Sequence, residues 1–126
     1  MTPGRALWRA EDGAALVEYA LVLPVLLLLV FGLMQLGGMA WTQAGLDYAV
    51  QQAARCAIVR PDLCGTADQI QGYAASQALG LGVPPQAFEV KASACGTDVS
   101  AQLTYSFIVS PFNKGAVPLS AEVCHP

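Results

Sequence analysis

The sequence predicts an α+β fold with a long N-terminal helix that leaves a membrane, a short second helix and a three-stranded antiparallel β-meander. Three observations predict this fold. No residue from Tyr19 to Leu46 carries a formal charge. A capping-box pattern begins a second helical segment at Thr66. From Phe88 onward, apolar residues recur at every second position, which is typical of strands with one buried face.

The composition favours a protein attached to a membrane. Hydrophobic residues make up 55% of the 126 residues and charged residues only 12%, about half the usual charged share of roughly 25%. The net charge is −3 and the six basic residues are scattered, whereas nucleic-acid binding needs clustered Lys and Arg. We therefore expect no nucleic-acid partner.

The chain is expected to have three parts. Residues 1–13 form a polar leader without an apolar face, which we expect to be flexible. Residues 14–60 form the hydrophobic N-terminal helix, with a membrane span at about 19–41 and an amphipathic extension. Residues 61–126 form a small extracytoplasmic αβ domain. Arg5 and Arg9 precede the span, so the positive-inside rule places the N-terminus in the cytoplasm and this domain outside.

The first helix is long enough to cross a bilayer and continue beyond it. The uncharged stretch would extend about 42 Å as a helix, whereas the hydrocarbon core is about 30 Å thick. Pro24 is expected to kink the helix locally, and Trp41 to act as an interfacial anchor. Because Pro61 disfavours a helical conformation at Arg60, the helix should end near Val59. Past the anchor, a polar stripe and a small-residue stripe run side by side: Gln43, Asp47, Gln51 and Arg55, and Gly45, Ala49, Ala53 and Cys56.

A second helix and three strands follow. The helix should start at Thr66, and Gly80, Gly82, Pro84 and Pro85 should stop it. Its apolar face comprises Ile70, Tyr73, Ala74, Ala78 and Leu81, with Gln77 as the polar interruption. The strands are expected over 88–94, 99–109 and 117–123, and Pro118 should place the third at an edge. The sheet's apolar face can then be covered by both helices.

Four cysteines follow the apolar stretch: Cys56, Cys64, Cys95 and Cys124. An even number in a small exported segment indicates disulfides, and the absence of a CxxC pair argues against zinc. Three pairings are possible; we favour Cys56–Cys64 and Cys95–Cys124. If the second strand is central, its neighbours lie about 9–10 Å apart, so the Cys95–Cys124 bond requires the chain ends to converge beyond the sheet. Four reduced thiols, which would indicate a cytosolic domain, are the alternative.

Glu18 stands at the head of the apolar stretch, five residues after Gly13. A carboxylate in a membrane span costs about 2.5–3.5 kcal/mol on insertion scales, so its presence there indicates a partner. The simpler interpretation is that Glu18 complements the positive end of the helix dipole.

These residues carry a resemblance to a known family. The string Gly13-Ala14-Ala15-Leu16-Val17-Glu18-Tyr19-Ala20-Leu21-Val22-Leu23-Pro24, with Ala53-Ala54-Arg55 further on, resembles the TadE-like pseudopilins of Tad (tight adherence) pilus systems, within the type IV pilin class. Glu18 and Tyr19 also resemble the Glu-Tyr pair of the small Flp pilins, but those chains end soon after the helix. The outer domain therefore favours a minor pilin or pseudopilin.

The resemblance implies cleavage between Gly13 and Ala14 by a prepilin peptidase in a bacterial inner membrane. It also implies that Glu18, beside Tyr19, faces the new α-amino group of a neighbouring subunit and fixes axial register. Other pilins, pseudopilins and the pilus assembly machinery would be partners, and the processed chain would reside in the membrane or in a Tad/Flp adhesive fibre.

No motif indicates an enzyme. The single histidine, His125, has no catalytic or metal-binding partner in the sequence, and neither a nucleophile elbow, an HExxH motif nor a phosphate loop occurs. We expect no metal, cofactor or small-molecule substrate. Two other functions are compatible with the pattern. One is a single-pass anchor for a periplasmic binding or scaffold domain that enters no fibre, and the other is a secreted protein with an export signal.

Overall fold

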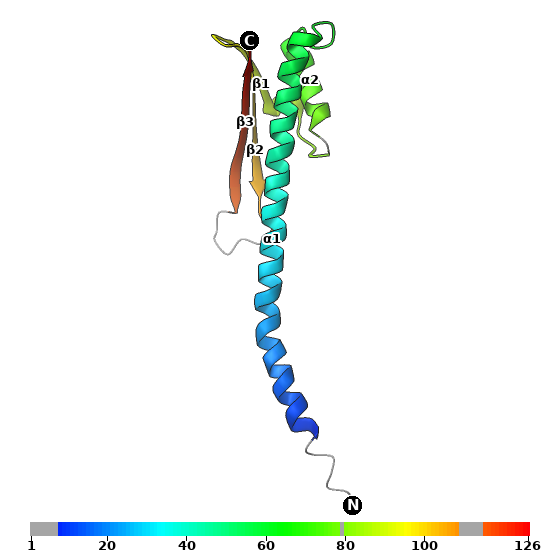
Figure 1. Ribbon diagram of the computed structural model, residues 1–126, viewed down its shortest axis with the longest axis vertical. Coiled ribbons are helices and arrows are strands. Elements are labelled where there is room, and N and C mark those ends of the chain that lie inside the picture. The colour runs from blue at the N-terminus through cyan, green and yellow to red at the C-terminus, as the bar shows by residue number, and fades with distance from the viewer. Residues whose placement is uncertain (1–7, 79, 109–114) are drawn as a thin grey trace, which may run out of the picture. The chain divides into compact units, whose positions relative to one another are not determined.

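A computed structural model describes residues 8–78, 80–108 and 115–126, with side chains from residue 13 onward. The elements are α1 (Trp8–Val59), α2 (Ala67–Gln77), the 3₁₀ helix η2 (Pro85–Ala87) and the strands β1 (Phe88–Ser93), β2 (Gly96–Ser106) and β3 (Ala116–His125) (Figure 1). The predicted α+β architecture is confirmed. The chain divides into two compact units, residues 1–36 and 37–126, here called the helical unit and the αβ unit.

Helix α1 begins earlier than the sequence predicted. It starts at Trp8, inside the expected flexible leader, and ends at Val59, as Pro61 required. Residues 8–12 include Arg, Ala and Glu, which are good helix formers, and contain no Gly or Pro. The absence of an apolar face therefore did not prevent the helix from extending through them. Residues 1–7 of the predicted leader lie outside the described residues.

Helix α2 starts as predicted. Thr66 is its N-cap: the Thr66 hydroxyl accepts from the backbone N–H of Gln69, and the Gln69 side chain accepts from the Thr66 N–H. Its apolar face packs inward through Ile70 and Ala74. The 3₁₀ helix η2 was not predicted, because Pro84 and Pro85 were expected only to stop α2. Pro84 and Pro85 are well placed for it, because proline fits the first turn of a helix.

The sheet has the order β1-β2-β3 with both pairs antiparallel, so the predicted meander is confirmed. Residue Val99 of the central strand pairs with Val90 on one side and Val123 on the other. Pro118 lies on the edge strand β3, as predicted.

The hydrophobic core lies within the αβ unit. Both helices contribute to it with small and branched side chains that let them approach the sheet closely, and Phe88, only 1% exposed, is among the largest. The other main members are Leu46, Ala49, Val50, Ala53 and Ala54 of α1, Ile70 and Ala74 of α2, and Val99, Ala101 and Ala121 of the sheet. The predicted small-residue stripe of α1 is thus largely a core surface.

Each edge of the sheet meets a glutamine from a helix. Gln43 of α1 donates from Nε2 to the carbonyl of Ser120 on β3 at 2.9 Å, and Gln71 of α2 donates to the carbonyl of Phe88 on β1 at 2.9 Å. Pro118 lies two residues before Ser120, so its backbone is directed to the same outer side of β3. Because proline has no N–H, this position offers no hydrogen-bond donor at the edge. These contacts occupy part of the backbone on both edges.

Candidate functional site

The Glu18 carboxylate lies on an exposed face of α1 that has a shallow groove. Ala15, Glu18, Tyr19 and Val22 line it, at the spacing that places residues on one side of a helix. The structure thus brings two predicted site residues, Glu18 and Tyr19, together. Among the described side chains, no basic group forms an ion pair with Glu18.

Gly13 and Ala14 lie within the continuous helix α1. Nothing lies within 4 Å of the position that a Cβ on Gly13 would occupy. Packing inside the chain therefore gives no reason for glycine here, and glycine weakens a helix by roughly 0.5–1 kcal/mol relative to alanine.

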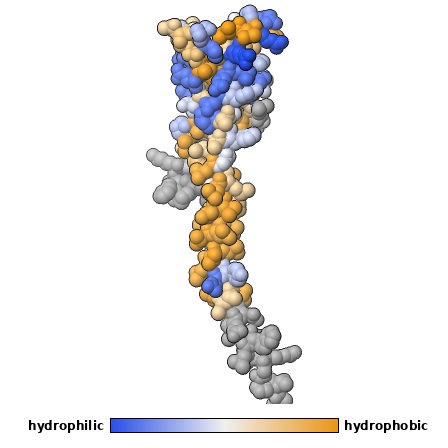
Figure 2. All heavy atoms as spheres, in the orientation of Figure 1, coloured by the Kyte–Doolittle hydropathy of each residue, from blue (hydrophilic) through white to orange (hydrophobic). Residues whose placement is uncertain are grey.

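The helical unit exposes apolar side chains on all sides. Leu16, Leu21, Leu28 and Met34 are all more than half exposed. In Figure 2 this surface is almost wholly hydrophobic apart from a short hydrophilic patch near its N-terminal end. Among the described residues, α1 is the one helix long and apolar enough to cross a membrane, over Gly13–Val59. This unit is compatible with a single-pass membrane anchor.

Both favoured disulfides are present in the structure. Cys56–Cys64 ties the end of α1 to the following loop with a Cα–Cα distance of 5.8 Å. Cys95–Cys124 joins the β1–β2 turn to the end of β3 at 6.2 Å. Cys95 follows β1 and directly precedes β2, so the turn carries it toward β3 and satisfies the required convergence. Gly96 makes this possible: its φ is +123°, and a Cβ there would collide with the carbonyl oxygen of His125.

The outer face of the sheet carries most of the charge on the strands. Lys91 bonds Glu89 at 2.8 Å, and this contact raises the pKa of Lys91 above its ordinary value, with smaller contributions from Asp98 and Glu122. The pair is exposed, so water screens it. Among the described residues, no three His, Cys, Asp or Glu side chains converge as a metal site, and His125 ends β3.

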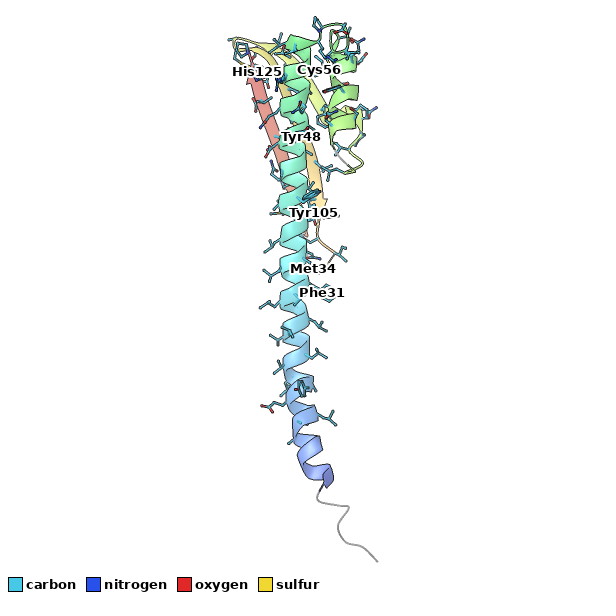
Figure 3. All side chains as sticks on the ribbon, turned by 45° about the vertical axis from the view of Figure 1, so that its right-hand side comes forward. Phe31, Met34, Tyr48, Cys56, Tyr105 and His125 are labelled. Atoms are coloured by element: carbon cyan, nitrogen blue, oxygen red, sulfur yellow. A yellow bond between two sulfur atoms is a disulfide. The ribbon has the colours of Figure 1, made fainter. Side chains whose placement is uncertain are left out.

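The structure reveals contacts that sequence patterns did not indicate. The Tyr105 hydroxyl lies against Gly38, 2.6 Å from where a Cβ would be, and the Tyr105 ring packs edge-on against Phe107 with centroids 5.3 Å apart. Figure 3 shows Tyr105 toward one end of the αβ unit and His125 at the other. Gln43 belongs to the expected polar stripe, but the four-residue spacing of that stripe did not indicate that Gln43 bonds the carbonyl of Ser120.

Comparison with known proteins gives one match. Residues 13–55 match the family model described as TadE-like protein. The matched segment makes up about a third of the chain and includes Gly13, Glu18 and most of α1. Searches of curated proteins and of solved structures return no match. The family match confirms the resemblance found in the sequence: residues 13–55 are similar to TadE-like proteins.

Proposed function

We propose that this chain is a minor pilin, or pseudopilin, whose processed form takes part in assembling a Tad pilus. The observation that carries the proposal is the carboxylate of Glu18, which has no ion-pair partner among the described side chains. It lies on an exposed apolar helix, five residues after Gly13, within the segment that matches the TadE-like family. The chain then acts as a structural subunit and not as an enzyme.

The first step is cleavage by a prepilin peptidase in the inner membrane. Water hydrolyses the peptide bond after Gly13, which leaves a carboxylate on Gly13 and a new α-amino group on Ala14. Because a protease binds its substrate in an extended form, α1 must unwind locally around the bond. Glycine favours both events, since it destabilises the helix and has no side chain to obstruct a narrow site.

The second step is contact between subunits. The new amine of Ala14 carries a positive charge, and the groove lined by Glu18 and Tyr19 offers a negative one. Between apolar helices the two charges offset part of each other's desolvation, and their meeting fixes one axial register, although the net stabilisation is small. In this arrangement the N-terminus begins in the cytoplasm, and residues 61–126 lie on the other side of the membrane.

Two measurements test the proposal. Mass spectrometry of the membrane form, from cells with and without the prepilin peptidase, should find chains that begin at Ala14 only when the peptidase is present. Glu18→Ala should reduce incorporation into pili without preventing cleavage. Glu122→Ala is the matched control, because it removes an exposed carboxylate from the αβ unit. A chain that keeps residue 1 in both strains contradicts the proposal.

A tethered binding or scaffold domain is the second candidate. It is favoured by the αβ unit, which has its own core and two disulfides. In that case Glu18→Ala and Glu122→Ala would both leave pili unchanged.

A further inference from the structure

The two disulfides of the αβ unit differ in how far they are exposed. Cys56 and Cys64 are only 4% and 2% exposed and belong to the core, whereas Cys95 is exposed and Cys124 is half-buried. Thiol–disulfide exchange begins when a thiolate reaches one of the two sulfur atoms, so access limits its rate. A thiolate of another molecule can therefore reach the Cys95–Cys124 bond in the folded chain, while packing protects the other bond.

Ser93 places a hydroxyl beside the exposed disulfide. The Ser93 Oγ lies 2.8 Å from the Sγ of Cys95 and 3.2 Å from the Sγ of Cys124. Because a disulfide sulfur carries no hydrogen, the hydroxyl is the donor in both contacts. When the S–S bond breaks, one sulfur leaves as a thiolate, and a hydrogen bond to a charged acceptor is stronger than one to a neutral acceptor. Ser93 is thus placed to stabilise the leaving sulfur as its charge develops.

Asp98 of β2 stands directly across from Cys124 of β3. Their neighbours Val99 and Val123 pack in the core, so Asp98 and Cys124 share the outer face of the sheet. The carbonyl of Ser120 points away from β2, and Cys124 lies four residues further along the same strand. The Asp98 and Cys124 backbones therefore do not bond each other, and pairs of this kind bring their side chains closest together.

One oxygen of Asp98 has an unmet need for a donor. Its Oδ1 is buried and has no hydrogen-bond partner among the residues that the structure describes. The neighbouring disulfide has no hydrogen to offer, but a reduced Cys124 thiol would carry an S–H that can donate to this oxygen. The carboxylate also repels an approaching thiolate from the Cys124 side. Attack is therefore directed to the sulfur of Cys95.

We propose that Cys95–Cys124 is a thiol–disulfide exchange site that reacts with the thiolate of another molecule, while Cys56–Cys64 stays closed. The incoming thiolate bonds the Sγ of Cys95, and the Cys95–Cys124 bond breaks. Its electron pair leaves on the Sγ of Cys124, which accepts the Ser93 hydrogen bond and then a proton from solvent. A second thiolate can attack the external sulfur of the mixed disulfide and release Cys95, so two thiols are oxidised to one disulfide for each bond reduced.

Opening this bond leaves the core of the αβ unit intact. The bond joins the β1–β2 turn to the end of the edge strand β3, which His125 marks in Figure 3. The core is formed by other residues, and the pairing of Thr97 with His125 does not need the bond. The site can thus carry a thiol-bearing molecule on a folded domain. It is independent of cleavage after Gly13, because precursor and processed chain contain the same αβ unit.

Exchange with two defined thiols tests the proposal. The full chain in detergent micelles is mixed with glutathione in one arm and with reduced thioredoxin in the other, and samples are quenched with acid and alkylated with iodoacetamide. Trypsin cuts after Lys91 and Lys114, so Cys95 and Cys124 fall on separate peptides. Mass spectrometry then measures the opening of each disulfide and locates the bound glutathione.

The exposed bond should open at least about tenfold faster than the buried one, with glutathione on the Cys95 peptide. Ser93→Ala should slow its opening by roughly threefold to tenfold, and Ser93→Thr, which keeps the hydroxyl, should retain the rate. The opening rate of Cys56–Cys64 should not change, which shows that the variants remain folded. Ser100→Ala is the matched control, because Ser100 lies on the same outer face between Glu89 and Glu122 and should leave both rates unchanged.

The outcomes separate the possible reactants. Faster opening by glutathione supports a small thiol as the reactant, and faster opening by thioredoxin supports a protein thiol. Equal opening of the two disulfides in both arms overturns the proposal, as does a rate that Ser93→Ala leaves unchanged. Glutathione found on the Cys124 peptide in place of the Cys95 peptide overturns the proposed attack.

Discussion

Removing the Cys95–Cys124 disulfide should destabilise the αβ unit mainly by raising the conformational entropy of its unfolded state. The bond closes a segment with a sequence separation of 29 residues. The loop-entropy relation then gives a loss of about 3.6 kcal/mol at 25 °C for the double variant Cys95→Ala/Cys124→Ala. Little packing is lost with it, because Cys95 is exposed and Cys124 only half-buried.

The second disulfide is the matched comparison. Cys56–Cys64 has a separation of 8 residues, for which the same relation gives about 2.5 kcal/mol. Its two cysteines are only 4% and 2% exposed, so replacing them also removes buried sulfur contacts. The loss from Cys56→Ala/Cys64→Ala should therefore exceed its loop value by about 1–2 kcal/mol.

Urea unfolding of the full chain in detergent micelles, followed by circular dichroism, measures both losses. Mild reduction separates the two contributions, because it opens the loops and keeps every sulfur atom in place. On reduction of single-disulfide chains, the Cys95–Cys124 chain should lose more stability than the Cys56–Cys64 chain. A loss below about 1 kcal/mol for Cys95→Ala/Cys124→Ala would refute the loop-entropy argument.

Three further predictions concern other parts of the chain. Gly13→Ala should stabilise the helix around the scissile bond by roughly 0.5–1 kcal/mol, which amide hydrogen exchange measures, and should abolish processing, which the mass of the chain reports. Continued cleavage of this variant would contradict the need for glycine. Thr66→Ala should cost about 1 kcal/mol in urea unfolding, whereas Thr66→Ser should retain the cap. Glu89→Gln should lower the pKa of Lys91 toward 10.5, measured by NMR titration of the Lys91 ammonium. A raised lysine pKa stabilises the folded state at pH values below 10.5, and this stabilisation is lost as the pH rises past the folded-state pKa. Because the pair is exposed and screened by water, the free energy of unfolding should hardly change between pH 6 and pH 9.

Local patterns predicted the elements because they depend on neighbours in the chain. The cap at Thr66, the stop before Pro61 and the alternation around Val99 are all short-range signals. The start of α1 at Trp8 was missed because polar composition was weighed above helix propensity.

Long-range contacts were predicted less completely. The pairing of Cys95 with Cys124 was favoured but left open, since it depends on how a turn carries one cysteine past a strand. The approach of Tyr105 to Gly38 and the bond from Gln43 to Ser120 were not predicted. Such contacts join residues far apart in sequence, so no local period encodes them. For the candidate site, Glu18 and Gly13 were proposed from the sequence alone, because the pattern that singles them out lies within one helix, and their roles stay a prediction.

The glutamines at the two edges of the sheet would have a consequence for a protein held at high density in a membrane. An edge strand with unpaired backbone groups can pair with the same strand of another copy, and copies confined to a membrane plane collide often. Gln43 and Gln71 already engage the carbonyls of Ser120 and Phe88, and Pro118 offers no donor. If the chain is a pilus subunit, as proposed, copies in the membrane can thus remain separate, and association is left to the helix that carries Glu18.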